Sequence, residues 1–269
     1  MGKAQTQGII VREVRGRTYL DASLDGEIYM IKTQVQGIIA REIGGRNYLD
    51  APHLDGEISF IPRAFGPDYR GVVAKQIKEA GLEFPTMAQN ASLVHTAWQN
   101  PKQRYSADIR KLQMFYWMRD SDGILYIPNE GAYIDDNPQV QGNFISMDKS
   151  NLVKRLESGD LSVRFVPFGF KIGEQSSRKL AKNQFVIALA GEEGAEKLAE
   201  VSDKYNGIPY VRSFDDVDSE TTTVACLGSD RSSSYERLYV YGNYFRGCGD
   251  GFALGKLPQT AEGRHAKLK

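Results

Sequence analysis

Two near-identical segments follow each other in this sequence, and they limit what its first part can fold into. Residues 7 to 32, QGIIVREVRGRTYLDASLDGEIYMIK, return as residues 36 to 63, QGIIAREIGGRNYLDAPHLDGEISFIPR. With one gap opened at His53 and Ser23 left out, 18 of the 25 positions from Gln7 to Lys32 are identical. This closeness indicates one supersecondary unit used twice, because a single copy of this size cannot bury its own apolar face.

Each copy predicts a three-stranded β-meander. In the first copy the strands are expected at residues 9–14, 18–22 and 27–31. The turns are expected at pairs that contain glycine, which favours the positive φ of tight hairpins: Arg15-Gly16, Asp25-Gly26, Gly44-Gly45 and Asp55-Gly56. The six strands should form one sheet or a small barrel, because three strands alone are marginally stable.

Length and charge limit the class of protein. The 269 residues suit two or three modest domains with ordinary cores. Lys plus Arg and Asp plus Glu number 34 each, so no excess of positive charge favours nucleic acid or an acidic membrane as partner. No apolar run reaches the roughly 20 residues of a membrane span, and residues 1–8 lack the apolar stretch of a secretory signal. A cytoplasmic protein is expected, and Gly2 fits a loose myristoylation pattern.

Residues 66–120 predict a helical segment after the repeat module of residues 1–65. Gly71 to Ala80 has apolar residues on one helical face. Met87 to Trp98 and Tyr105 to Tyr116 each repeat apolar residues at i, i+4, i+7 and i+11. The run from Met114 to Met118 is interpreted as a helix buried all round, with a pocket lining as the alternative.

Residues 121–258 predict an α/β domain, and residues 259–269 a polar tail. A βαβαβ unit with a parallel sheet is expected from strands at 163–166, 185–190 and 208–211 and helices at 174–182 and 192–205. A strand at 124–127 and a helix at 149–157 precede it. Antiparallel strands are expected at 221–227, 237–241 and 251–254, so the fold class is α+β.

Three stretches of this second part resemble hypothetical proteins predicted from archaeal genomes. They are NFISMDKSNLVKRLE (143–157), RFVPFGFKIGEQSS (164–177) and FVIALAGEEGAEKLAEVSDKY (185–205). The resemblance covers the C-terminal two thirds and excludes the repeats. It implies an archaeal, cytoplasmic protein and assigns no activity or residue role.

The first βα turn of the expected parallel unit is a candidate anion site. Gly173 would let a ligand approach the backbone, and Lys171, Ser176 and Arg178 could add charge and hydrogen bonds at a helix N-terminus. The stretch is not a P-loop, because neither Lys-Ser nor Lys-Thr follows its second glycine. Serine at a helix start is more often a cap, so the structural interpretation is favoured.

Asp215, Asp216 and Asp218 follow the strand that ends near Val211 and are candidate ligands for a divalent cation. Ligand sites of α/β sheets lie beyond the carboxyl ends of parallel strands, so these carboxylates could face Lys171 across one crevice. A solvated turn is the favoured alternative, since the spacing is not that of an EF-hand. No motif identifies a cofactor.

The repeats and the C-terminal strands carry candidate contact residues. Arg17 and Tyr19 return as Arg46 and Tyr48, and such pairs can stack on planar ligands or anchor a protein interface. Cross-strand salt bridges explain the same arginines without a partner. Tyr239, Tyr241, Tyr244, Phe245 and Arg246 suggest a platform for single-stranded nucleic acid, or simply one face of a strand.

The leading hypothesis is a binding protein without catalytic activity, with a protein or a small molecule as partner. Only three histidines occur, GxSxG is absent, and Cys226 and Cys248 lack CxxC spacing. The alternatives are a metal-assisted hydrolase or nucleotide-handling enzyme at the edge of the parallel sheet, and a nucleic-acid-binding protein that uses β surfaces.

Overall fold

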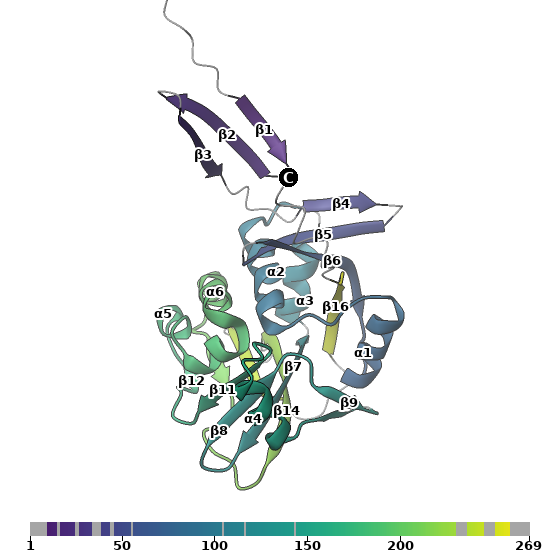
Figure 1. Ribbon diagram of the computed structural model, residues 1–269, viewed down its shortest axis with the longest axis vertical. Helices are drawn as coiled ribbons and strands as arrows, with labels where there is room; N and C mark the ends of the chain where they lie inside the picture. Colours follow the sequence, from purple (N-terminus) through teal and green to yellow (C-terminus); the bar gives the residue numbers. More distant parts are fainter. Residues whose placement is uncertain are drawn as a thin grey trace, which may run out of the picture.

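The computed structural model contains both helices and strands and confirms the α+β class (Figure 1). Most side chains from Tyr48 onward are described. The backbone is described for residues 10–14, 17–24, 27–33, 39–43, 46–54, 56–103, 105–115, 117–142, 144–229, 236–244 and 251–258.

Each repeat copy forms three antiparallel strands. The first copy forms a separate sheet, β1-β2-β3. The first hairpins have the same register, because Ile10 pairs with Asp21 in one copy and Ile39 with Asp50 in the other. The strands are β1 (Ile10–Val14), β2 (Arg17–Leu24), β3 (Glu27–Thr33), β4 (Ile39–Ile43), β5 (Arg46–His53) and β6 (Gly56–Phe65).

The second hairpins differ by one residue of register. Leu20 pairs with Ile31 in the first copy, whereas Leu49 pairs with Phe60, which is the counterpart of Met30. The extra residue at His53 causes this shift: β2 and β5 both have 8 residues, so His53 ends β5 and Leu54, the counterpart of the last residue of β2, falls in the turn. Leu54 takes φ 49°, and Gly56 begins β6 instead of closing the expected turn. The other three predicted turn pairs lie outside the described residues.

The remaining strands extend the second repeat into one mixed sheet. Its order is β12-β13-β15-β14-β7-β16-β6-β5-β4, with β8 paired to β7 and β11 to β8. Strand β16 is the link, because it pairs antiparallel with β6 and parallel with β7. These strands are β7 (Trp117–Ile127), β8 (Gly131–Asp135), β11 (Val163–Pro167), β12 (Gly173–Glu174), β13 (Tyr210–Arg212), β14 (Thr221–Ser229), β15 (Leu238–Tyr244) and β16 (Gly251–Lys256), while β9 (Gln139–Gln141) and β10 (Phe144–Ser146) form a separate ribbon.

The predicted helices of the middle segment form close to their expected bounds. They are α1 (Arg70–Glu79), α2 (Met87–Gln99) and α3 (Ser106–Phe115). Helix α2 begins at Met87 because Thr86 and Gln89 form a capping box. The run from Met114 to Met118 is not one buried helix, since α3 ends at Phe115 and β7 begins at Trp117.

The expected βαβαβ unit does not form. Residues 185–190 lie in helix α6 (Gln184–Ser202), because a short apolar run fits a buried helix as well as a strand, and Asn183 caps the helix through the amides of Phe185 and Val186. Strand β11 pairs antiparallel with β8, and β13 is parallel to β15. The expected helix at 174–182 is reduced to α5 (Ser177–Leu180), whereas α4 (Lys149–Glu157) forms as predicted.

The main core joins the second repeat to the helices and the sheet. Leu49, Ala51, Ile58 and Phe60 are at most 2% exposed and share one apolar cluster with residues of α2, α3 and α6. In Figure 1, β5 and β6 lie across α2 and α3. In the described part of the chain, no helix is long and apolar enough to cross a membrane.

Gly242 tests the fit of β15 to α6. A Cβ at Gly242 would lie 2.1 Å from Phe185 Cζ, inside the buried core. We expect Gly242→Ala to lower the free energy of unfolding by about 1–3 kcal/mol, measured by denaturant titration. Gly56→Ala is the control, because its Cβ would meet no heavy atom closer than 3.9 Å. An equal loss in both variants would contradict the packing described here.

Candidate functional site

The predicted anion-binding loop leads into a single helical turn. Lys171 and Arg178 are exposed, and Gly173 takes φ 84° at the start of β12. Ser176 is the N-cap of α5, which has 4 residues, and its side chain makes no capping hydrogen bond. The carbonyl of Lys171 accepts a hydrogen bond from Asn183 Nδ2 at 2.6 Å. The loop is therefore fastened to the start of α6.

The three candidate metal ligands lie exposed in the loop after β13. Asp216 Oδ1 accepts hydrogen bonds from the amides of Asn129 at 3.1 Å and Val217 at 2.8 Å. Among the described residues, no three His, Cys, Asp or Glu side chains are arranged to hold a metal ion. Asp215 and Asp218 therefore do not form such a group with Asp216. The carboxylate of Asp216 stabilises the backbone of its loop.

The expected crevice between these two loops lacks its structural basis. It requires parallel strands that leave one sheet edge together, whereas β11 and β13 are not paired and β11 is antiparallel to its neighbour. Within the described ranges, no hydrogen bond or ion pair joins the candidate residues of one loop to those of the other. The first loop carries Lys171, Ser176 and Arg178, and the second carries Asp215, Asp216 and Asp218.

The candidate contact residues of the repeats lie on paired strands, and for most of them only the position of the backbone is described. Tyr48 is half-buried, and the side chains of Arg17, Tyr19 and Arg46 lie outside the described part. In register, Tyr19 pairs with Arg12, and Tyr48 with Arg41. The same cross-strand arginine–tyrosine pair therefore occurs in both copies.

The C-terminal tyrosines stack on one another. Tyr239 and Tyr241 have ring centroids 5.3 Å apart, and Trp117 packs edge-on against Tyr241 at 4.6 Å. Tyr239 is 9% and Tyr241 4% exposed, so their faces are not available for stacking on bases. Phe245 and Arg246 lie outside the described residues.

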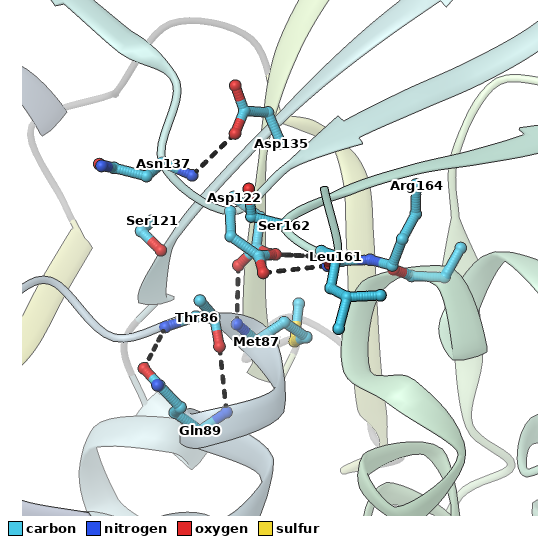
Figure 2. A network of polar contacts seen from close by, with 12 residues as sticks. Thr86, Met87, Gln89, Ser121, Asp122, Asp135, Asn137, Leu161, Ser162 and Arg164 are labelled. Atoms are coloured by element: carbon cyan, nitrogen blue, oxygen red, sulfur yellow. Dashed lines mark hydrogen bonds and ion pairs between the residues drawn. The ribbon is translucent and has the colours of Figure 1, made fainter. Parts of the chain in front are cut away.

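Strand β7 carries buried polar residues that the sequence analysis did not identify. Arg119, Asp120, Ser121 and Asp122 are each at most 4% exposed. Asp120 Oδ1 accepts a hydrogen bond from Asn90 Nδ2 at 2.5 Å. Asp122 Oδ2 accepts one at 2.7 Å from the amide of Met87, so its carboxyl group lies at the N-terminus of α2 (Figure 2).

Burial changes the ionisation of these two acids. It raises the pKa of Asp120 to about 8, against smaller lowering effects of Asn90 and Arg70. Burial, followed by repulsion from Asp136 and Asp120, raises the pKa of Asp122 well above its usual range. Arg164 lowers the Asp122 pKa only in part, because its Nη2 lies 3.6 Å from Asp122 Oδ1. At neutral pH Asp120 is therefore mainly protonated.

The pKa shift of Asp120 is of the size found in catalytic sites. However, Asn90, Asp120 and Asp122 are 0% exposed, so a substrate cannot reach the carboxyl groups. Buried atoms without a hydrogen bond concentrate here: Arg70 Nε and Nη1, Asn90 Oδ1, Asp120 Oδ2, Ser121 Oγ and Asp122 Oδ1. Such atoms are commonly satisfied by internal water. We interpret the group as a buried structural network.

A serine, a histidine and a lysine meet where the second repeat contacts α2 and α6. His53 Nδ1 and Lys197 Nζ lie 3.0 and 2.9 Å from Ser92 Oγ. Lys197 also donates to the carbonyl of Pro52 at 3.1 Å and pairs with Glu193. The grouping resembles a nucleophile with its base, but Ser92 is only 1% exposed. It therefore fastens the repeat to the helices, and we call it the repeat junction.

The repeat junction lies at the one insertion that distinguishes the two copies. His53 has no counterpart in the first copy, and Ser23 stands where the second copy has Pro52. Burial and the nearby Lys197 ammonium lower the pKa of His53, so its ring is neutral at pH 7. Sequence reasoning missed the junction because its residues come from distant segments.

A cavity of about 360 Å³ lies between the second repeat, β16 and α3. Its walls are mainly apolar, with Tyr105, Asp108 and Lys111 as the polar lining residues. Asp108 and Lys111 are exposed. The apolar lining residues are Leu49, Pro62, Ala64, Ile109, Leu112 and Leu254. Of the sites described above, it is the one that combines an apolar interior with exposed charged groups.

The buried acid Asp120 predicts a pH dependence of stability. Its pKa of about 8 in the folded state lies above that of an unfolded aspartate, so between about pH 4 and 8 the folded state keeps a proton that the unfolded state has lost, and stability falls as pH rises through this range. We expect Asp120→Asn, which mimics the protonated acid, to weaken the fall in stability between pH 5 and 8 in thermal unfolding. Asp215→Asn, at an exposed position, should leave that fall unchanged.

The repeat junction predicts a second change in stability. Lys197→Met removes the ammonium group that donates to Ser92 Oγ and to the carbonyl of Pro52, so each of these two oxygens loses one hydrogen-bond donor. We expect the free energy of unfolding to fall by about 1–3 kcal/mol in urea titrations. Lys204→Met, at an exposed position, is the matched control and should change it by less than about 0.5 kcal/mol.

Comparison of the chain with models of protein families, with curated proteins and with solved structures gives no match. The geometry of the sites is therefore the basis for assigning a function.

Proposed function

We propose that the protein binds a small amphipathic molecule in the cavity between the second repeat and α3. The observation that supports this function is the cavity itself. Its volume of about 360 Å³ falls within the roughly 300–1,000 Å³ of small-molecule sites. Apolar walls with a few polar groups are also typical of such sites.

The lining residues favour a ligand with an apolar body and a polar end. Tyr105, Asp108, Ile109 and Leu112 lie at i, i+3, i+4 and i+7, so one side of α3 and the residue before it line the cavity. Leu49 and Leu254 close the inner side and are at most 2% exposed. An apolar group gains about 25 cal/mol per Å² when it leaves water here, while the ligand's polar end stays near the exposed charges.

The same lining favours binding over nucleophilic catalysis. Among the described lining residues there is no serine, cysteine or histidine. The polar groups are a tyrosine, an aspartate and a lysine, which can orient a ligand by hydrogen bonds and charge. These groups therefore suit the cavity to the recognition of a ligand.

Filling the cavity tests the proposal. Decanoate and decyltrimethylammonium share an apolar chain and differ in the charge of the head group, so both serve as probes in isothermal titration calorimetry. We expect at least one to bind, and Leu112→Trp to weaken it about tenfold or more, because the added ring occupies the cavity. Leu156→Trp, on the exposed side of α4, is the matched control and should bind as the parent does.

Comparing the two probes, whose head groups have opposite charge, identifies the charge that the protein recognises. Lys111→Met should weaken decanoate alone, and Asp108→Asn should weaken decyltrimethylammonium alone. If neither probe binds the parent, or if Leu112→Trp binds as well as Leu156→Trp, the cavity is not the binding site.

A further inference from the structure

The two repeat copies have the same strands but different surroundings. In the second copy, the outer edge of β6 is occupied by β16, which pairs with it antiparallel. In the first copy, β3 pairs with β2 alone within the described part of the chain. A three-stranded sheet is marginally stable by itself, and a sheet edge without a partner readily recruits another strand.

The repeat junction holds the second copy to the helices, and among the described residues the first copy makes no such junction. His53 and the carbonyl of Pro52 make the contacts to Ser92 and Lys197. The first copy has no residue at the position of His53. It therefore lacks the group that contacts α2, although 18 of 25 compared positions are identical.

Strand β3 is also the better pairing edge by sequence. Its residues are EIYMIKT, which include four consecutive apolar residues, three of them with high strand propensity, and no proline. The second copy has Pro62 where the first has Lys32, so one backbone N–H is missing from β6. A full set of N–H donors remains along β3.

We propose that β3 pairs with β3 of a second copy of this chain, so that two first repeats form one six-stranded antiparallel sheet. A two-fold axis perpendicular to the sheet makes identical edge strands antiparallel, which is the sense in which β16 joins β6. Charge does not oppose this self-association. Residues 10–33 carry four basic and four acidic side chains: Arg12, Arg15, Arg17 and Lys32 against Glu13, Asp21, Asp25 and Glu27.

The symmetry fixes the register if the whole strand is used. Strand β3 runs from Glu27 to Thr33, so Met30, at its centre, lies on the axis opposite Met30 of the second copy. Glu27 then faces Thr33 of the second copy, and Ile28 faces Lys32 of the second copy. This register places no like charges opposite each other, which would be unfavourable.

Sedimentation equilibrium of the full chain tests the dimer. We expect the parent to dimerise at concentrations up to roughly 100 µM, where a contact of micromolar affinity is populated. Met30→Lys places two ammonium groups opposite each other on the axis and should weaken the dimer about tenfold or more. Val140→Lys, on an exposed strand of the separate ribbon, should leave it unchanged. Fluorescence of Trp98 and Trp117 during unfolding shows whether the core of each variant is intact.

A cysteine scan tests the axis. In a Cys248→Ser background, Tyr29→Cys, Met30→Cys and Ile31→Cys are oxidised, and Cys226 stays because it is buried. Only the residue on the axis has its copy within the roughly 4.4–6.8 Å between Cα atoms that a disulfide needs, so the intermolecular yield should peak at residue 30. Ser59→Cys, at the counterpart of Tyr29 in β6, should not cross-link. A monomeric parent, a dimer insensitive to Met30→Lys, or equal yields at all positions would overturn the proposal.

Discussion

The burial of one face of the second repeat against the helices is the interaction on which the rest of the structure depends. Leu49, Ala51, Ile58 and Phe60 lose nearly all contact with water there. Large aliphatic and aromatic side chains contribute about 1.5–3 kcal/mol each when fully buried. This contact sets the position of β6, which in turn positions β16, and β16 joins the repeat to β7. The cavity beside α3 is enclosed by the same elements.

The polar interior of β7 shows how the fold accommodates acids in its core. The carboxyl groups of Asp120 and Asp122 are both buried on β7, where ionising both would cost much free energy. Protonation removes that cost for Asp120, and the helix N-terminus at Met87 supplies a donor to Asp122. Arg164 pairs with Asp136 beside them and also approaches Asp122. The network ties β7 to α2 and β11 without an open active site.

Local patterns predicted much of the fold, and long-range contacts decided the rest. The spacing of apolar residues placed α1, α2 and α3 within a few residues of their bounds, because an amphipathic helix encodes its own face. Residues 185–190 were misassigned, since periodicity does not separate a buried helix from a buried strand in so short a run. The repeat junction joins residues 53, 92 and 197, and the cavity joins residues 49, 109 and 254, so no sequence window contains either. The polar residues of β7 were missed because the strand was expected to begin only at residue 124.

The position of β16 along the chain has a consequence for how the protein is made. Its partner β6 leaves the ribosome about 190 residues earlier, which corresponds to roughly 10–40 s at 5–20 residues per second. During that interval the outer edge of β6 has no native partner, and neither does the edge of β7 that β16 later joins. Closure of the sheet therefore waits until β16 has been synthesised. Until then the nascent chain carries exposed strand edges, the feature that chaperones and neighbouring nascent chains most readily engage.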